Sequence, residues 1–163
     1  MAKMKPRYAA ALLLAGLAGV AVMLGSALAQ LEQKVLASGE YSDDPNLRCD
    51  LLEVKRVSGG ALNIRWRVVN TTGRAGGLTG AAGKAISYRF SWNELYFIDP
   101  AENKKYGFLT DSAGNRVLQI ASEYPAAEQR GNWAKFPAPP TTSKKISIYI
   151  PKFPPFDDVP ISE

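Results

Sequence analysis

The chain has 163 residues, a formal net charge of +5 at pH 7, one cysteine and no histidine. The missing histidine excludes Ser-His and Cys-His catalytic triads and histidine-ligated zinc or copper sites, and it removes the commonest general acid–base group. The single cysteine, Cys49, excludes an internal disulfide, and its place at the start of an expected strand predicts a buried thiol, with pairing between chains as the alternative. The composition therefore predicts a protein that is not an enzyme of the usual classes and that needs no cofactor or metal.

The first 29 residues have the pattern of an export signal. Three positive charges stand before residue 8, an uncharged run rich in Ala, Leu and Gly follows, and Ala27-Leu28-Ala29 supplies a small-x-small cleavage site. We predict that residues 1–29 are a signal peptide and that the mature protein is periplasmic or extracellular. The alternative is an uncleaved inner-membrane anchor, because the run is about as long as a membrane span, and membrane contact is expected only in that case.

Much of the basic character belongs to this leader. The remaining residues contain 17 Lys and Arg against 15 Asp and Glu, which is close to balance. No cluster of basic residues is interleaved with aromatic ones there. We therefore expect no nucleic-acid partner.

Beyond the leader the sequence reads as strands. Residues 30–47 are polar and contain turn signals, which predicts a flexible or irregular segment before the domain. From there on, apolar and polar residues alternate, as in half-buried antiparallel strands. The alternation is clearest over 61–70, where one face carries Leu62, Ile64, Trp66 and Val68. A strand over 50–57 precedes it, and Ser58-Gly59-Gly60 predicts the hairpin turn that joins the two.

Later runs predict further strands. They cover 86–92, 95–99, 105–110, 116–120, 133–136 and 146–150. The loop 111–115 between two of them places Gly114 where a hairpin needs a positive φ. Seven or eight strands without an amphipathic helix predict an all-β fold, an immunoglobulin-like antiparallel β-sandwich over residues 48–150. A closed barrel is the alternative.

The glycine-rich stretch 71–85 interrupts the strands with five glycines and hardly any bulky apolar residue. This composition predicts a flexible loop, because nothing in it offsets the entropy of ordering the backbone. Gly83-Lys84 is similar to the end of a P-loop, but Leu78 stands where the motif needs its first glycine and Ala85 where it needs a hydroxyl. We expect no phosphate site there.

The C-terminal segment 151–163 is rich in proline and phenylalanine. Its prolines favour an extended, polyproline-like path. Phe153 and Phe156 are unfavourable in water, since burying such a side chain is worth about 1.5–3 kcal/mol. We predict that this segment is a latch over an edge strand of its own domain. Docking to a partner is the alternative.

Exposed aromatic and basic side chains are the candidates for partner binding. Trp133 follows Gly131-Asn132 and is expected to be the most exposed tryptophan, whereas Trp66 and Trp92 fall on apolar strand faces that predict a core position. Three arginines are predicted on solvent-facing positions, where they would form a positive patch if their strands are neighbours. The candidate residues are Trp133, Phe153, Phe156, Arg65, Arg67 and Arg89.

Aromatic residues and carboxylates suggest two further sites. A platform for stacking a carbohydrate or peptide would draw on Trp66, Tyr88, Trp92, Tyr96, Phe97, Tyr106, Phe108 and Trp133. The acidic residues Asp99 and Asp111 stand at turns, where the side chain caps the backbone. Interpreted functionally, such residues would form the pair of catalytic carboxylates of a glycosidase.

Several stretches resemble one family. The runs 92–100, 105–114, 133–140 and 153–161 are similar to a group of uncharacterised exported bacterial proteins with an immunoglobulin-like β-sandwich. Some relatives in that group are joined to an OmpA-type peptidoglycan-binding domain. The resemblance implies the same fold and an envelope location, and it assigns no functional residue.

Together these observations predict a non-enzymatic exported binding or interaction protein of the bacterial cell envelope, with a protein partner. The alternative is a glycan- or peptidoglycan-binding module that uses exposed aromatic residues. A hydrolase that works with carboxylates alone is a distant third.

Overall fold

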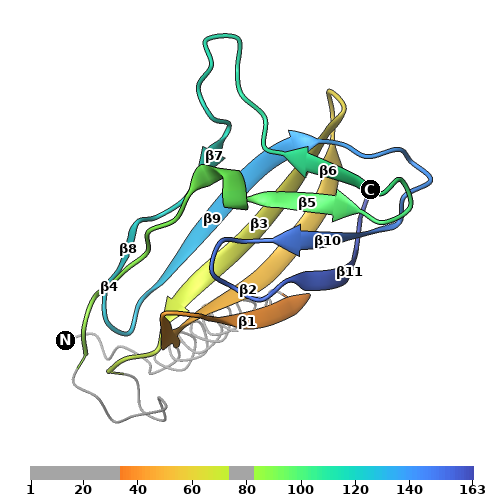
Figure 1. Cartoon of the computed structure of the whole chain (residues 1–163). Coiled ribbons are helices and arrows are strands. Elements are labelled where there is room, and N and C mark those ends of the chain that lie inside the picture. The colour runs from red at the N-terminus through yellow and green to blue at the C-terminus, as the bar shows by residue number, and fades with distance from the viewer. Residues whose placement is uncertain (1–33, 74–82) are drawn as a thin grey trace, which may run out of the picture. The chain divides into compact units, whose positions relative to one another are not determined.

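A computed structural model describes residues 34–73 and 83–163, which belong to one compact unit (Figure 1). The predicted signal peptide and most of the glycine-rich stretch lie outside the described residues. Within the described ranges, no helix has the length and hydrophobicity that crossing a bilayer requires.

Strands account for nearly all regular structure in the described part of the chain. In order they are β1 (Ala37–Tyr41), β2 (Asp44–Val57), β3 (Ala61–Asn70), β4 (Ile86–Ser87), β5 (Tyr96–Asp99), β6 (Lys104–Gly107), β7 (Leu118–Gln119), β8 (Glu123–Tyr124), β9 (Gln129–Pro137), β10 (Lys145–Tyr149) and β11 (Phe156–Pro160), with the 3₁₀ helix η1 (Trp92–Glu94) before β5.

The strands form two facing sheets (Figure 1). One has five strands in the order β1-β2-β3-β9-β7, and the other has four in the order β11-β10-β5-β6. β4 and β8 form a small separate pair. All strand pairs are antiparallel, so the all-β antiparallel sandwich predicted from the sequence is confirmed.

The core lies between the sheets, on the faces that the alternation predicted. β3 spans the predicted residues, and its inward side chains Leu62, Ile64, Trp66 and Val68 are each at most 1% exposed. Phe97 of the opposite sheet stacks on Tyr106, with ring centroids 4.6 Å apart, and meets the edge of Phe136 at 5.5 Å. Cys49 of β2 is buried as predicted, and burial raises the pKa of its thiol well above the ordinary value.

The sandwich begins earlier than predicted. Residues 30–47 were expected to be flexible or irregular, but β1 and the first residues of β2 lie there and form an antiparallel hairpin. Of the turn signals in this segment, only Asp43 lies in the turn between the two strands, whereas Ser38-Gly39 lies within β1 and Asp44-Pro45-Asn46 within β2. Only one face of this hairpin is buried, through Tyr41 and Leu47, so its overall composition remains polar.

Two other segments differ from their predictions. Only residues 86–87 of the predicted strand 86–92 pair with another strand, and Trp92 begins η1 and is half-buried instead of lying in the core. The hairpin loop 111–115 is confirmed, with Gly114 at φ 82°. Its two arms diverge, however, because β6 pairs with β5 and β7 pairs with β9 of the other sheet.

The C-terminal segment is a strand of the fold, not a polyproline-like latch. β11 pairs with β10 at the edge of the four-stranded sheet, where Pro160 costs no ladder hydrogen bond on the free side. Phe153 and Phe156 are buried against their own domain, as predicted, and not left free for a partner. Beyond β11, Ser162 donates its backbone N–H to Val54 of β2 at 2.8 Å and so ties this end to the five-stranded sheet.

β1 approaches the turn 151–155 so closely that position 39 requires glycine. A Cβ atom on Gly39 would lie 2.6 Å from Cγ of Pro154. We expect Gly39→Ala to lower the free energy of unfolding by about 1–3 kcal/mol because of this overlap. Pro154→Ala in the same protein removes the overlapping atoms and restores most of the loss.

Urea denaturation of the parent, both single variants and the double variant gives the coupling between the two sites. Gly131→Ala is the matched control, because Gly131 is also in a strand and has nothing within 4 Å of its Cβ position. Additive effects of Gly39→Ala and Pro154→Ala contradict the prediction.

Candidate functional site

The structure brings three of the candidate residues together on the outer face of the five-stranded sheet. Arg65 and Arg67 project from β3, and Trp133 of β9 lies directly opposite Arg65 in the register. Trp133 is half-buried, and its Nε1 donates to Oε1 of Gln119 on β7 at 3.2 Å. This group is the Trp133 face.

The predicted positive patch is largely neutralised on this face. Arg67 donates through Nε to Oδ2 of Asp50 at 2.9 Å, and Arg48 donates to Oδ1 of the same carboxylate at 2.9 Å. Arg65 lies 3.9 Å from a carboxylate oxygen of Glu53. Arg89 is exposed on the segment after β4 and belongs to neither large sheet, so it does not extend the patch.

Asp50 gives the Trp133 face a pH-dependent contribution to stability. Burial raises the pKa of its carboxyl, but hydrogen bonds from Arg48, Ser38 and Arg67 outweigh burial and leave the pKa below the ordinary value. A carboxylate with a depressed folded pKa stabilises above its unfolded pKa, and this stability disappears as the pH falls through the folded pKa.

We therefore expect Asp50→Asn to lower the free energy of unfolding at neutral pH by about 1–3 kcal/mol. The difference from the parent shrinks below about pH 4, where unfolded aspartate is protonated. Urea denaturation at pH 7 and pH 3 checks this, with exposed Asp157→Asn as the control. A difference that stays constant with pH contradicts the prediction.

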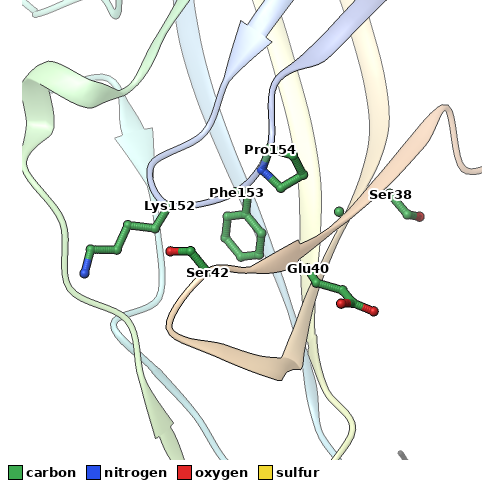
Figure 2. A pocket seen from close by; sticks show the side chains of 7 residues that line it. Ser38, Glu40, Ser42, Lys152, Phe153 and Pro154 are labelled. Atoms are coloured by element: carbon green, nitrogen blue, oxygen red, sulfur yellow. The ribbon is translucent and has the colours of Figure 1, made fainter.

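A first hollow lies beside β1 and contains Phe153. It has a volume of about 740 Å³ and is lined by Ser38, Gly39, Glu40, Ser42, Lys152, Phe153 and Pro154. Figure 2 shows Phe153 and Pro154 above β1, between Ser38 and Lys152. The cation at its rim is engaged, because Nζ of Lys152 lies 2.5 Å from Oδ2 of Asp43. Phe153 is only 8% exposed, so it presents little surface to a partner.

A second hollow, the aromatic hollow, lies where η1, β5 and β6 meet. Its volume is about 350 Å³, and it is lined by Trp92, Asn93, Leu95, Tyr96, Lys105, Gly107 and Phe108. Three of these side chains, Trp92, Tyr96 and Phe108, belong to the aromatic set predicted from the sequence. The structure places them at one site.

The hollow is open because the strand register places a glycine, which has no side chain, opposite Tyr96. Gly107 of β6 lies directly opposite Tyr96 of β5, and nothing is within 4 Å of the position that its Cβ would occupy. Gly107 is the last residue of β6 and carries no side chain on this face of the sheet. The position therefore leaves room beside the Tyr96 ring that any larger residue would fill.

Neighbouring rings hold the walls of the hollow in place. Tyr96 stacks on Tyr149 of β10, with centroids 4.6 Å apart and planes at 15°. Trp92 meets the edge of Phe108 at 6.2 Å and that of Phe90 at 4.9 Å. Such pairs add about 0.5–1.5 kcal/mol each beyond burial, so the rings are pre-positioned.

Two cations lie over these rings. Nζ of Lys105 is 3.7 Å from the centre of the Tyr96 ring, and the guanidinium of Arg116 is 4.6 Å from the centre of Trp92. Among the described residues, neither cation is within 4.0 Å of a carboxylate oxygen. Sequence reasoning missed Lys105, Gly107, Arg116 and Tyr149. The glycine inside the apolar strand run was the one available signal.

The two carboxylates that the sequence suggested as candidates, Asp99 and Asp111, accept hydrogen bonds that stabilise turns. Asp99 is fully buried and accepts hydrogen bonds from Oγ of Ser143 and from the backbone of Ala101. Asp111 accepts from two backbone N–H groups of its own loop. Across residues 34–73 and 83–163, no three His, Cys, Asp or Glu side chains gather as metal ligands.

Comparison of the chain with protein-family models, with curated proteins and with solved structures gives no match. The residues themselves must therefore carry any functional argument. Among the sites formed by residues 34–73 and 83–163, the aromatic hollow combines open space with cations that have no carboxylate partner.

Proposed function

We propose that the chain is a non-enzymatic binding protein of the bacterial cell envelope, exported by its N-terminal segment. The aromatic hollow is the observation that carries this proposal. It offers aromatic walls, an amide and the Lys105 ammonium around a space that Gly107 keeps open, and the Arg116 guanidinium lies over its Trp92 wall. The positive start and the small-x-small site at residue 29 support export.

The size of the hollow favours a small ligand. A volume of about 350 Å³ is at the low end for small-molecule sites, which suits one or two sugar rings. A saccharide stacks its C–H face on aromatic rings and uses amides and charged groups for orientation. These features favour the glycan-binding alternative.

A protein partner is the second candidate, and the Trp133 face favours it. Trp133 and Arg65 are neighbours on two broad strands, and tryptophan and arginine are enriched among the residues that dominate protein interfaces. The flat sheet surface around them suits a protein more than a sugar.

We expect Gly107→Val to abolish ligand binding in the hollow because the added methyl groups fill its open space. The assay uses soluble peptidoglycan fragments and a panel of bacterial envelope polysaccharides. Tryptophan fluorescence reports binding in a Trp133→Phe background, where Trp92 remains half-buried beside the ligand and Trp66 stays in the core.

Gly131→Val is the matched control, since it places the same side chain on an open strand position of the other sheet. We expect the control to bind as the parent does and Gly107→Val to bind at least about tenfold more weakly, or about 1.4 kcal/mol. Circular dichroism confirms that both variants fold. Equal binding by the two variants, or no binding of any glycan by the parent, contradicts the proposal.

A further inference from the structure

We infer that the ligand of the aromatic hollow is an acidic saccharide, whose carboxylate pairs with Lys105 and Arg116 while its sugar ring fills the space above Gly107 between the aromatic side chains. This inference rests on the proposed function and names the ligand class of the same site. Three properties of the site support it, namely its charge, its hydrogen-bond donors and its shape.

The first property is the charge of the side chains around the hollow. Lys105 and Arg116 lie over its walls, whereas the neighbouring Lys104 is on the opposite face of β6, where its ammonium lies over the Tyr106 ring. Of the nearby carboxylates, Glu102 accepts from the hydroxyl of Tyr106 and Asp99 is buried under Ser143, which leaves Glu94 of η1 as the exposed one against two cations. An anionic ligand is therefore complementary to this site.

On the outer face of the five-stranded sheet, by contrast, the cations are paired with carboxylates. There, Arg48, Arg65 and Arg67 each have a carboxylate within 4.0 Å. The cations of the hollow have no such partner in the described ranges. Their charge is available to a ligand.

The second property is the supply of unused hydrogen-bond donors on Lys105 and Arg116. An ammonium group carries three donors and a guanidinium five, and the guanidinium fork matches a carboxylate with two parallel bonds. In the residues the structure describes, the side chains of Lys105 and Arg116 donate to no protein acceptor. The ring beneath each cation holds it by electrostatic attraction without using these donors.

The third property is the shape of the open space in the hollow. The space above Gly107 is bounded by Tyr96, Trp92 and Phe108, so the ligand must present an apolar face of about ring size. A pyranose ring has such a face, and Asn93 at the rim supplies an amide for its hydroxyls. The small volume and the ring walls favour a saccharide over an extended acidic peptide.

The test compares acidic saccharides with neutral forms of the same molecules. The probes are oligomers of glucuronic acid, oligomers of galacturonic acid and a muramyl disaccharide, each with its methyl ester, and hexaglutamate represents a peptide. Titrations follow tryptophan fluorescence at low and at high salt, because screening weakens an exposed charge contact.

We expect at least one acid to bind about tenfold or more tightly than its ester. Lys105→Gln and Arg116→Gln remove this preference, whereas binding of the ester changes little. Lys55→Gln is the matched control, since Lys55 is exposed on β2 and has no ion pair in the described part of the chain. It leaves the preference intact.

The inference is overturned if no acid binds more tightly than its ester, if hexaglutamate binds best, or if Lys105→Gln and Lys55→Gln behave alike. Failure of the proposed function looks different. If neutral glycans bind and Gly107→Val abolishes their binding, the hollow is a binding site but its ligand is not acidic. If nothing binds, both proposals fail together.

Discussion

Replacement of both Phe153 and Phe156 by alanine is expected to lower the free energy of unfolding by about 6 kcal/mol or more, since each large-to-small change in a core costs about 3–5 kcal/mol. Both side chains are buried, and the Phe153 ring lies 5.6 Å from that of Tyr41 and 5.8 Å from that of Tyr88. A loss of this size is comparable with the whole stability of a small domain, about 5–15 kcal/mol. The double variant is therefore largely unfolded.

Near-ultraviolet circular dichroism and urea denaturation of the full chain measure this effect. Pro155→Ala is the control, because Pro155 lies between the two phenylalanines in sequence and is exposed. We expect it to remain within about 1 kcal/mol of the parent, as surface substitutions generally do. A double variant that unfolds at nearly the parent's urea concentration contradicts the role given to β11.

Asn70→Ala is expected to be the most damaging single polar substitution. The Asn70 side chain is fully buried at the end of β3 and makes hydrogen bonds in both directions. Its Nδ2 donates to the backbone oxygens of Lys84 and Tyr124 at 2.7 and 2.8 Å, and its Oδ1 accepts from the backbone and the hydroxyl of Thr72. These bonds join three segments that are distant in sequence.

Each buried polar group left without a partner costs about 1–3 kcal/mol. We therefore expect Asn70→Ala to lower the free energy of unfolding by about 3 kcal/mol or more, as measured by urea denaturation. Asn63→Ala is the control on the same strand. Asn63 is half-buried and its side chain makes one bond, to Glu53 at 3.2 Å, so its loss is expected to be about 1 kcal/mol. Similar losses for the two variants refute this view of Asn70.

The central strands were predictable because their two faces differ in polarity. β10 and the middle of β3, residues 62–68, are fully buried on one face only, so alternation alone identified them and the residues of their inward faces. The edge strands β1 and β11 were not predictable in this way. Their pairing depends on contacts with distant residues, and their sequences contain the turn and proline signals that favour irregular structure.

The candidate site was predictable only in part. Residue type suggested Trp92, Tyr96 and Phe108 as stacking groups, and it suggested Trp133 and Arg65 as exposed ones. The aromatic hollow also needs Tyr149, which lies beside Tyr96 because of the register between β5 and β10. A sequence without known registers does not show which side chains of different strands meet.

The contact of β1 with the segment after β10 has a consequence for synthesis on the ribosome. The Tyr41 ring packs against Phe153, and Ser162 bridges to Lys55 of β2. Because such long-range pairings slow folding and leave strand edges bare meanwhile, the nascent chain cannot reach its native state until β11 has been translated. Until then its open sheet edges are exposed to aggregation.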